Sequence, residues 1–501
     1  MYTLGQLLTD RAKKYSDRTF CLFENEALSY ASMEATANAM AHGLIEQGCK
    51  PGDKIAVLLP NIPEWLITFF AVAKAGATVV PINSLLKREE AQFILNNSQA
   101  NKLITIPHFV DQLRAIRNEM EHLNDIYVVA DEAPRGMKIF DELLAEREDP
   151  PQVEIKGDDI AGIIYTSGMT GHPKGAMLSH RNYLANAEKI VAAMKMNERD
   201  RFMNILPMFH VNAQLVAFLS PLYAGGSMVL MRGFSPREFL PALDRYKATA
   251  FVGVPTVYAI LNELPDAEKY DLSSLRFCVC GAAPMKVDVF ERFEEKYNAK
   301  IIEGYGLSEA TCATSINPID GKRKIGSIGL PLPGVDMKII DDSDNEVPQG
   351  GEGEIVIRGE LVMKGYFKDD EATQDTLRDG WLYTGDIGYV DEDGYFFIRG
   401  RKKDMIIRGG ENIYPREVED VLITHPDVLE VAVVGKTDPI WGEEVVAYIV
   451  PQEAKTPSRT QIREYCRQHL ADYKCPTRIV FVDKMPKTAL MKVRRWALRD
   501  E

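Results

Sequence analysis

Apolar and polar positions along the first part of the chain follow two different periods. Residues 54–60 (KIAVLLP) form a short apolar run, residues 61–76 repeat apolar positions with a helical period, and residues 77–83 (ATVVPIN) are rich in β-branched side chains. A strand, a helix and a second strand in this order are typical of a βαβ unit with parallel strands. The pattern therefore predicts a parallel sheet that is covered by helices.

The same alternation recurs further along the chain. Strand-like runs lead into a glycine loop at residues 158–168, into a helix at 248–264 and into a turn at 275–284. From about residue 329 the pattern changes to short strands separated by Gly, Pro and Asp turns, which is typical of antiparallel pairing. We expect residues 1–400 to form a large N-terminal α/β domain of helix-covered sheets with a small antiparallel β subdomain.

Residues 401–501 have a compact pattern of their own. A glycine turn precedes a helix that begins near Pro415, residues 428–436 are strand-like, and residues 458–470 are helical in period. About 100 residues with two helices and several strands suffice for a small domain. We therefore predict a small, mobile α+β C-terminal domain, since 501 residues are too many for one hydrophobic core.

Composition narrows the range of partners and of locations. The net charge of -14 disfavours nonspecific binding to nucleic acid and to anionic membranes. The seven cysteines are scattered without zinc-site spacing, which favours reduced thiols in a cytoplasmic protein. The first 20 residues lack the apolar core of a signal peptide, so we expect no export. The uncharged run 212–231 is interrupted by polar residues, and we expect it to form a buried helix followed by a strand and no membrane span. Transient membrane association and the oligomeric state are left open.

Residues 165–176 (YTSGMTGHPKGA) carry the strongest chemical signal. They follow an apolar strand and combine three glycines and several hydroxyl groups with Lys174. Such a loop can surround an anion with backbone N–H groups, while the lysine adds a positive charge. The order of the common P-loop is absent. Taken alone, the segment is as often a simple turn as a phosphate site.

Further motifs follow this loop in order: LPMFHVNAQ (206–214), CGAAP (280–284), EGYGLSEAT (303–311), GEIVIRGELVMKGYF (353–367), WLYTGDIG (381–388), GRKKDMIIRGGENIYPREVE (400–419) and PKTALMK (486–492). The series covers essentially the whole chain. It resembles the adenylate-forming superfamily of acyl-CoA and aryl-CoA synthetases, firefly-type luciferases and peptide-synthetase adenylation domains. The resemblance implies an ATP-dependent carboxylic acid–CoA ligase that proceeds through an acyl-AMP and uses ATP, Mg²⁺ and coenzyme A.

The resemblance also implies roles for individual residues in ATP binding. The loop would hold the phosphates, the CGAAP and EGYGLSE segments would contact adenine and the α-phosphate, Asp386 and Arg401 would contact the ribose, and Glu309 would hold magnesium. The implied ATP-binding residues are Thr166, Ser167, Gly168, Met169, Thr170, Gly171, Lys174, Ala283, Glu303, Gly304, Tyr305, Ser308, Asp386, Arg401 and Lys492.

The remaining implied roles concern the acid, coenzyme A and the movement between the two half-reactions. Lys492 would bridge the carboxylate and the α-phosphate, which makes it catalytic together with His210 and Glu309. Lys403 would be the interdomain hinge. The acid pocket would contain His210, Gln214, Gly281 and Gly304, and coenzyme A would meet Gly409, Gly410, Trp441 and Tyr473.

Two departures from the family pattern keep alternatives open. Met491 stands where relatives usually carry glycine before the catalytic lysine, and Ser308 replaces the usual threonine. An adenylation enzyme, a luciferase-like oxygenase and a catalytically impaired nucleotide-binding homologue therefore remain alternatives. The candidate pocket residues are mostly small or apolar, which favours a fatty or aromatic monocarboxylic acid. Chain length of the acid cannot be predicted from them.

Overall fold

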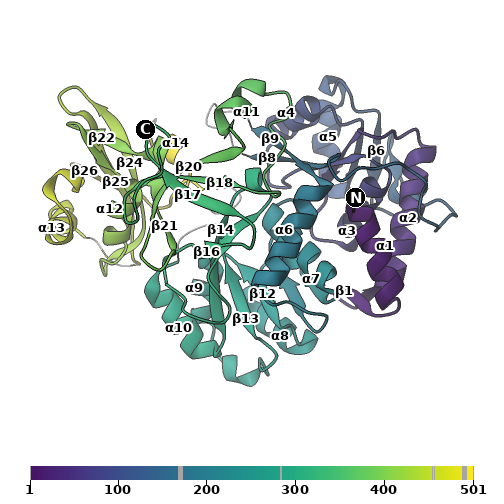
Figure 1. The fold of residues 1–501 in the computed structure, drawn as a ribbon, viewed down its shortest axis with the longest axis horizontal. Helices are drawn as coiled ribbons and strands as arrows, with labels where there is room; N and C mark the ends of the chain where they lie inside the picture. The colour runs from purple at the N-terminus through teal and green to yellow at the C-terminus, as the bar shows by residue number, and fades with distance from the viewer. Residues whose placement is uncertain are drawn as a thin grey trace. The chain divides into compact units, whose positions relative to one another are not determined.

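The computed structural model describes residues 2–166, 173–281, 285–453, 455, 457–487 and 493–499. The chain folds into two compact units (Figure 1). Unit 1 comprises Met1–Met337 and Ile357–Leu382, and unit 2 comprises Lys338–Val356 and Tyr383–Glu501. The predicted boundary at residues 400 and 401 falls inside unit 2, and its role as a boundary between moving parts stays a prediction.

Unit 1 contains two large sheets with helices packed on them. A nine-stranded sheet has the order β16-β15-β14-β13-β12-β10-β11-β1-β2, and a seven-stranded sheet has the order β7-β6-β5-β3-β4-β8-β9. The strands of the first are β1 (Thr19–Phe23), β2 (Glu26–Ser29), β10 (Arg201–Asn204), β11 (Ser227–Leu230), β12 (Ala250–Gly253), β13 (Phe277–Cys280), β14 (Lys300–Gly306), β15 (Ala313–Ile316) and β16 (Leu330–Pro331). Those of the second are β3 (Lys54–Leu58), β4 (Thr78–Pro81), β5 (Lys102–Thr105), β6 (Asp125–Val128), β7 (Lys138–Ile139), β8 (Ile160–Thr166) and β9 (Lys174–Ser179).

The two sheets of unit 1 are accompanied by α-helices. They are α1 (Leu4–Tyr15), α2 (Tyr30–Glu46), α3 (Pro63–Lys74), α4 (Arg88–Ser98), α5 (Val110–Ile116), α6 (His180–Ala193), α7 (Ser220–Ala224), α8 (Pro236–Tyr246), α9 (Pro255–Glu263), α10 (Val287–Tyr297) and α11 (Asp370–Thr376). Of these, α3 and α9 coincide with the helical patterns at residues 61–76 and 248–264. The predicted βαβ unit is confirmed, because β3 and β4 pair in parallel across α3 with Ile55 opposite Val79.

The uncharged run 212–231 is a buried helical segment followed by a strand, as expected. A π-helix (Ala213–Leu219) continues directly into α7, and β11 follows it. Within the described part of the chain, no helix is both long and apolar enough to cross a membrane.

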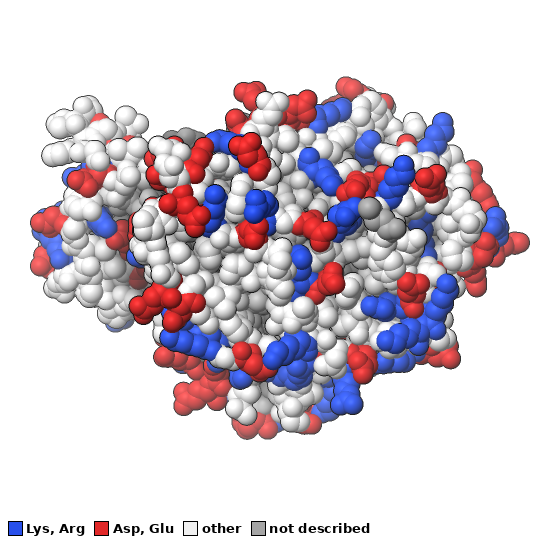
Figure 2. Space-filling model, viewed as in Figure 1, with Lys and Arg blue, Asp and Glu red and all other residues white. Residues whose placement is uncertain are grey.

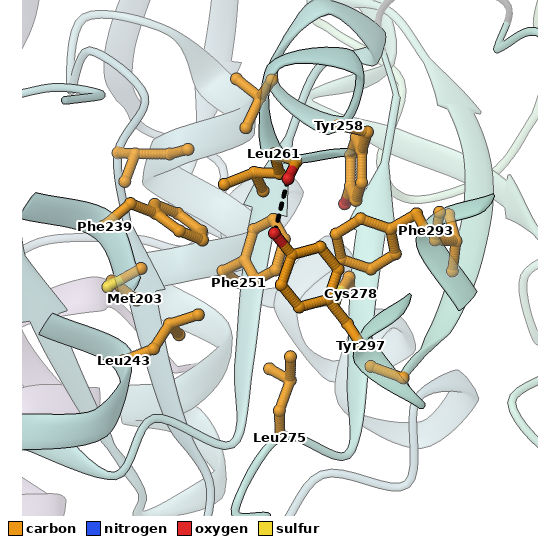
Figure 3. Close-up of a cluster of buried hydrophobic side chains, with 14 of the residues drawn as sticks. Met203, Phe239, Leu243, Phe251, Tyr258, Leu261, Leu275, Cys278, Phe293 and Tyr297 are labelled. Carbon is orange, nitrogen blue, oxygen red and sulfur yellow. Dashed lines mark hydrogen bonds between the residues drawn. The ribbon is translucent and has the colours of Figure 1, made fainter. Parts of the chain in front are cut away.

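A cluster of buried aromatic side chains packs against the nine-stranded sheet (Figure 3). Phe251 on β12, Tyr258 on α9 and Phe293 on α10 are almost completely buried and lie against one another. Tyr297 donates a hydrogen bond of 2.5 Å from its hydroxyl to the Leu261 carbonyl. Tight packing of this kind holds neighbouring backbone rigidly. The carboxyl ends of β12, β13 and β14, which are parallel, are therefore fixed on one edge of the sheet.

Residues 336–401 build a smaller, five-stranded sheet with the order β17-β18-β20-β19 and β21 paired to β20. The pairs β19–β20 and β20–β21 are antiparallel, in agreement with the predicted subdomain. The strands are β17 (Asp336–Ile340), β18 (Gly353–Arg358), β19 (Leu377–Arg378), β20 (Trp381–Val390) and β21 (Phe396–Arg401).

The last hundred residues form a second five-stranded sheet with helices, which confirms the predicted α+β character of this region. Its order is β23-β22-β25-β24 with β26 paired to β25. The elements are β22 (Ile406–Arg408), β23 (Glu411–Ile413), α12 (Pro415–Leu422), β24 (Val428–Asp438), β25 (Gly442–Pro451), α13 (Arg459–His469), β26 (Arg478–Phe481) and α14 (Arg495–Arg499). Pro415 stands in the first turn of α12, where its missing N–H costs nothing.

Acidic and basic side chains are interspersed on the face of the molecule that Figure 2 shows. Several of the surface lysines are paired, for example Lys195 with Asp320 at 2.8 Å and Lys247 with Asp271 at 2.8 Å. Such exposed pairs contribute little to stability. These pairs neutralise part of the positive charge on the surface.

Candidate active site

The predicted phosphate loop connects the two strands of an antiparallel hairpin. Thr166, the last residue of β8, lies opposite Lys174, the first residue of β9. These two residues therefore mark the base of the loop. Five further candidates lie outside the described residues: Ser167, Gly168, Met169, Thr170 and Gly171.

A distant segment pairs with the free edge of β9 and places a tyrosine beside Lys174 at the base of the loop. Met177 N–H donates to the Gly365 carbonyl at 2.9 Å, and Phe367 N–H donates to the Gly175 carbonyl at 2.8 Å. Tyr366 is thereby placed opposite Ala176. The Lys174 ammonium lies 5.4 Å from the centre of the Tyr366 ring, within the range of a cation–π contact.

Asp369 is the carboxylate partner of the loop lysine. Its Oδ2 atom lies 3.8 Å from Lys174 Nζ, and its Oδ1 accepts the Ala372 N–H at the start of α11. Asp369 thus keeps the lysine side chain near the loop base while it caps a helix.

The carboxylate of Glu309 lies next to Thr166 at the base of the phosphate loop. Glu309 follows β14 in a short 3-10 helix, Ser308–Ala310. Its Oε1 accepts hydrogen bonds from Tyr366 OH at 2.9 Å and from Thr166 Oγ1 at 3.4 Å. Burial and the nearby Glu309 charge raise the pKa of Tyr366, so its hydroxyl stays protonated and acts as the donor.

The residue that follows this helix has a strained backbone. Thr311 has φ 63° and ψ −55°, and Cys312 N–H donates to the Ala310 carbonyl at 2.7 Å. These values define a γ-turn of the rare, strained kind. Backbone strain of this sort costs roughly 1–3 kcal/mol and is found most often near functional sites. Thr311 is buried, and its hydroxyl donates to the Leu361 carbonyl at 2.6 Å.

The implied adenine residues stand at the carboxyl end of β14. Gly304 and Tyr305 pair with β15, opposite Ile316 and Ser315 respectively. Glu303 is buried and accepts the Gly326 N–H at 3.0 Å, so one of its oxygens is used within the protein. Ala283 lies outside the described residues.

Part of the implied acid pocket is brought together at the ends of β13 and β14. A methyl group placed on Gly281 would lie 3.6 Å from the Gly304 carbonyl oxygen and 3.7 Å from Asn212 Nδ2. The His210 ring lies against Phe209 with 4.1 Å between the ring centres. Gly281 and Gly304, neither of which has a side chain, therefore lie close together.

Gln214 has a different environment from the other implied acid-pocket residues. Its side chain is completely buried. The amide nitrogen donates to the Met208 carbonyl at 3.0 Å, and the amide oxygen accepts the Tyr183 hydroxyl at 3.2 Å. Both ends of the amide are therefore occupied within the protein, and Gln214 is placed to hold the backbone of the 206–214 segment.

The implied ribose residues form an ion pair in unit 2. Asp386 and Arg401 are opposite each other on β20 and β21, with 2.9 Å between Arg401 Nε and Asp386 Oδ1. Lys403 lies two residues beyond Arg401 in a 3-10 helix, Lys402–Asp404. The implied hinge thus follows the ribose pair directly.

The implied coenzyme A residues share one surface of unit 2. Gly409 and Gly410 both have positive φ, at 61° and 88°, and Gly409 N–H donates to the Trp441 carbonyl at 2.8 Å. Arg408 lies 5.5 Å from the centre of the Trp441 ring and donates to the Tyr473 carbonyl. Trp441 is 53% exposed, which leaves much of its ring open to a ligand.

The donor atoms near the phosphate loop fit magnesium. Mg²⁺ prefers oxygen ligands and is usually held by one or two carboxylates together with substrate phosphates. Glu309 offers a carboxylate and Thr166 a hydroxyl. Among the described residues there is no group of three or more His, Cys, Asp or Glu that could hold a metal alone. Lys492, the implied catalytic lysine, lies outside the described part of the chain.

Three residues of the site were not predicted from the sequence: Thr311, Tyr366 and Asp369. Thr311 and Tyr366 lie inside the EGYGLSEAT and GEIVIRGELVMKGYF motifs. For both residues, a hydroxyl side chain inside a motif was the only sequence feature that could have indicated a role in the site. Asp369 lies just outside these motifs, and only the pairing of residues 364–367 with β9 reveals it.

The helix-covered sheets, the loop at the β8–β9 hairpin and the adjacent carboxylate define an adenylate-forming enzyme. The chain matches the family model described as AMP-binding enzyme over residues 8–367 and the model described as AMP-binding enzyme C-terminal domain over residues 417–492. The chain belongs to the AMP-binding enzyme family.

Known relatives match the chain along its whole length. It is 36% identical to a long-chain-fatty-acid–CoA ligase of Bacillus subtilis, covering 100% of this chain and 94% of the relative. It is 37% identical to a feruloyl-CoA synthase of Amycolatopsis, and the match covers 99% of this chain and 98% of the relative. Among solved structures, an anthranilate CoA ligase in complex with anthranoyl-AMP matches with a TM-score of 0.91 and 31% identity, covering 100% of this chain and 97% of that one.

Proposed function

We propose that this protein, an ATP-dependent acid–CoA ligase, activates a fatty or aromatic monocarboxylic acid as an acyl-AMP and transfers the acyl group to coenzyme A. The observation that carries the proposal is the convergence of Lys174, Thr166 and Glu309 at the base of the β8–β9 loop. One cation, one carboxylate and a hydroxyl group around a glycine-rich loop suit a polyphosphate with its metal ion.

The first half-reaction needs little proton transfer. The acid is already ionised at neutral pH, so a carboxylate oxygen attacks the α-phosphorus of ATP, and the bond to the β-phosphate oxygen breaks to release pyrophosphate. Lys174 would bind the phosphates, and Lys492 would draw the two anions together. Glu309 would hold Mg²⁺, which when bound would supply positive charge to stabilise the leaving pyrophosphate.

In the second half-reaction the thiol of coenzyme A attacks the carbonyl carbon of the acyl-AMP. The bond between that carbon and the phosphate oxygen breaks, AMP leaves, and the thiol proton is lost to solvent or to a nearby base. His210 would lie beside the reacting carbonyl. Gly409 and Gly410 would line the path of the pantetheine arm, because glycine leaves room for it.

The proposed class of acid rests on the described residues of the pocket. Phe209 is apolar, Gly281 and Gly304 have no side chain, and Asn212 is uncharged. A second carboxylate on the substrate would require a cationic partner, which these four residues do not provide. The proposal includes a cytoplasmic location, where the seven free cysteines of the protein would stay reduced.

ATP–pyrophosphate exchange tests the proposal when it is measured with fatty, aromatic, dicarboxylic and amino acids in parallel. We expect exchange that depends on a monocarboxylic acid, and formation of the matching CoA thioester by mass spectrometry once coenzyme A is added. Exchange with amino acids and no thioester would indicate an adenylation enzyme instead. Oxygen consumption or light emission after adenylation would indicate a luciferase-like oxygenase.

A further inference from the structure

Tyr366 lies between the two charged residues that the proposed function uses in unit 1. Its hydroxyl is 2.9 Å from Glu309 Oε1, and its ring centre is 5.4 Å from Lys174 Nζ. The side chain is 8% exposed. One aromatic residue therefore contacts both the implied metal-binding carboxylate and the phosphate-binding lysine.

The position of Tyr366 is fixed from several directions. Its backbone is paired with β9 opposite Ala176, and its N–H donates to Thr373 Oγ1 at 2.8 Å. The segment that carries it also receives Glu309, because Met363 N–H donates to the Glu309 carbonyl at 2.8 Å. The backbone of Tyr366 and that of Glu309 are therefore both anchored around the hydrogen bond between their side chains.

Both hydroxyl donors converge on the same oxygen of Glu309. Tyr366 OH and Thr166 Oγ1 donate to Oε1, and within the described residues no hydrogen bond is made to Oε2. A carboxylate held through one oxygen presents its other oxygen in a defined direction. This arrangement is typical of the partners that orient a metal ligand from outside the coordination sphere.

We propose that Tyr366 is a positioning residue that orients the Glu309 carboxylate toward the metal ion of the metal–nucleotide complex. The inference rests on the proposed function, since it requires that the protein binds ATP with a divalent cation. Loss of such an outer partner typically weakens metal binding about 10-fold to 100-fold. Tyr366→Phe removes only the hydroxyl and keeps the ring beside Lys174.

The test measures metal binding without catalysis. Mn²⁺ serves as the probe, and the free ion is followed by electron paramagnetic resonance in the presence of saturating α,β-methylene-ATP, which cannot release pyrophosphate. Nucleotide binding is measured separately with EDTA by equilibrium dialysis. Tyr246→Phe is the matched control, because it removes a tyrosine hydroxyl that donates to the Glu24 carbonyl elsewhere in unit 1.

We expect Tyr366→Phe to weaken Mn²⁺ binding by about 10-fold or more while metal-free nucleotide binding stays at the parent value. Tyr246→Phe should match the parent in both assays. In a Glu309→Gln background, Tyr366→Phe should have little further effect on Mn²⁺, because the two residues act through one contact. A merely structural role of the hydroxyl would instead weaken nucleotide binding in EDTA and would persist in the Glu309→Gln background.

Several outcomes overturn the proposal. Parent-like Mn²⁺ binding by Tyr366→Phe would rule out positioning while leaving the proposed function intact. Failure of the parent protein to bind the nucleotide at all would overturn the proposed function, and this inference with it. Should Tyr366→Phe fail to fold, Tyr366→Leu decides instead, since it also removes the hydroxyl that donates to Glu309 Oε1, and parent-like Mn²⁺ binding by it would rule out positioning.

Discussion

Thr311 occupies a backbone conformation that a β-branched residue rarely adopts. Its φ of 63° places it in the left-handed region, two residues after Glu309. The hydrogen bond from its buried hydroxyl to the Leu361 carbonyl offsets part of the strain. The side chain therefore connects the strained turn to a second turn, at Leu361, that precedes Tyr366.

Replacement of Thr311 by valine tests this account at the level of one hydroxyl group. Valine has the same shape and the same backbone restriction, so the change removes the hydrogen bond and leaves the Leu361 carbonyl without this donor. We expect a loss of about 1–3 kcal/mol in the free energy of unfolding. Urea denaturation followed by circular dichroism measures it.

Thr36→Val provides the control for that substitution. Thr36 lies on the surface of α2, and its hydroxyl donates to the Ser32 carbonyl in the same helix. Surface changes of this kind usually stay within about 0.5 kcal/mol. Equal stability of Thr311→Val and Thr36→Val would show that the Thr311 hydroxyl contributes nothing beyond a surface hydrogen bond.

Sequence patterns predicted some residues of the site and missed others for physical reasons. Lys174 stands out because it adds a positive charge to a glycine-rich loop, whereas the role of Glu309 was implied by the family resemblance. Thr311 does not stand out, since nothing in its identity indicates a positive φ. The acid-pocket role of Gln214 stays a prediction, and the hydrogen bonds of its amide to Met208 and Tyr183 could not be predicted from the sequence because they depend on the fold.

At the level of elements, regular periodicity predicted individual strands and helices but not their long-range pairing. The β3–α3–β4 unit and the α12 start at Pro415 are local features and were predicted. The pairing of β9 with residues 364–367 joins segments far apart in the sequence, and hydrophobic patterns do not specify such partners. Placement of β1 beside β11 was missed for the same reason.

The short helix that contains Lys403 is the element in which the hinge prediction can be tested. Lys403→Pro fixes φ near one value and should hinder a change of backbone angles at this position. We expect the variant to keep measurable acid-dependent pyrophosphate exchange and to lose overall thioester synthesis. Each half-reaction is measured separately, with thermal unfolding as a check of folding.

Lys403→Ala serves as the control because it removes the same side chain and leaves φ unrestricted. It should retain more thioester synthesis than Lys403→Pro. Thioester synthesis by Lys403→Pro at the parent rate would show that no backbone change at Lys403 is needed between the half-reactions.

At the level of the whole molecule, residues with implied roles are distributed over both compact units. The phosphate-loop, metal and acid residues belong to unit 1, and the ribose, hinge and coenzyme A residues belong to unit 2. The division into these units was not predicted, because residues 338–356 join unit 2 while residues 357–382 return to unit 1. The order of motifs along the chain does not show that the chain passes from unit 1 to unit 2 and back again.

The route through an acyl-AMP is the central claim, and transfer of oxygen-18 tests it most directly. An acid labelled with oxygen-18 on both carboxylate oxygens is turned over with ATP and coenzyme A, and the products are analysed by mass spectrometry. Attack of the carboxylate on the α-phosphorus, followed by cleavage of the bond between the acyl carbon and oxygen, leaves one labelled oxygen on AMP and one in the thioester. We predict this distribution. Unlabelled AMP, or label in orthophosphate together with ADP, would contradict the account.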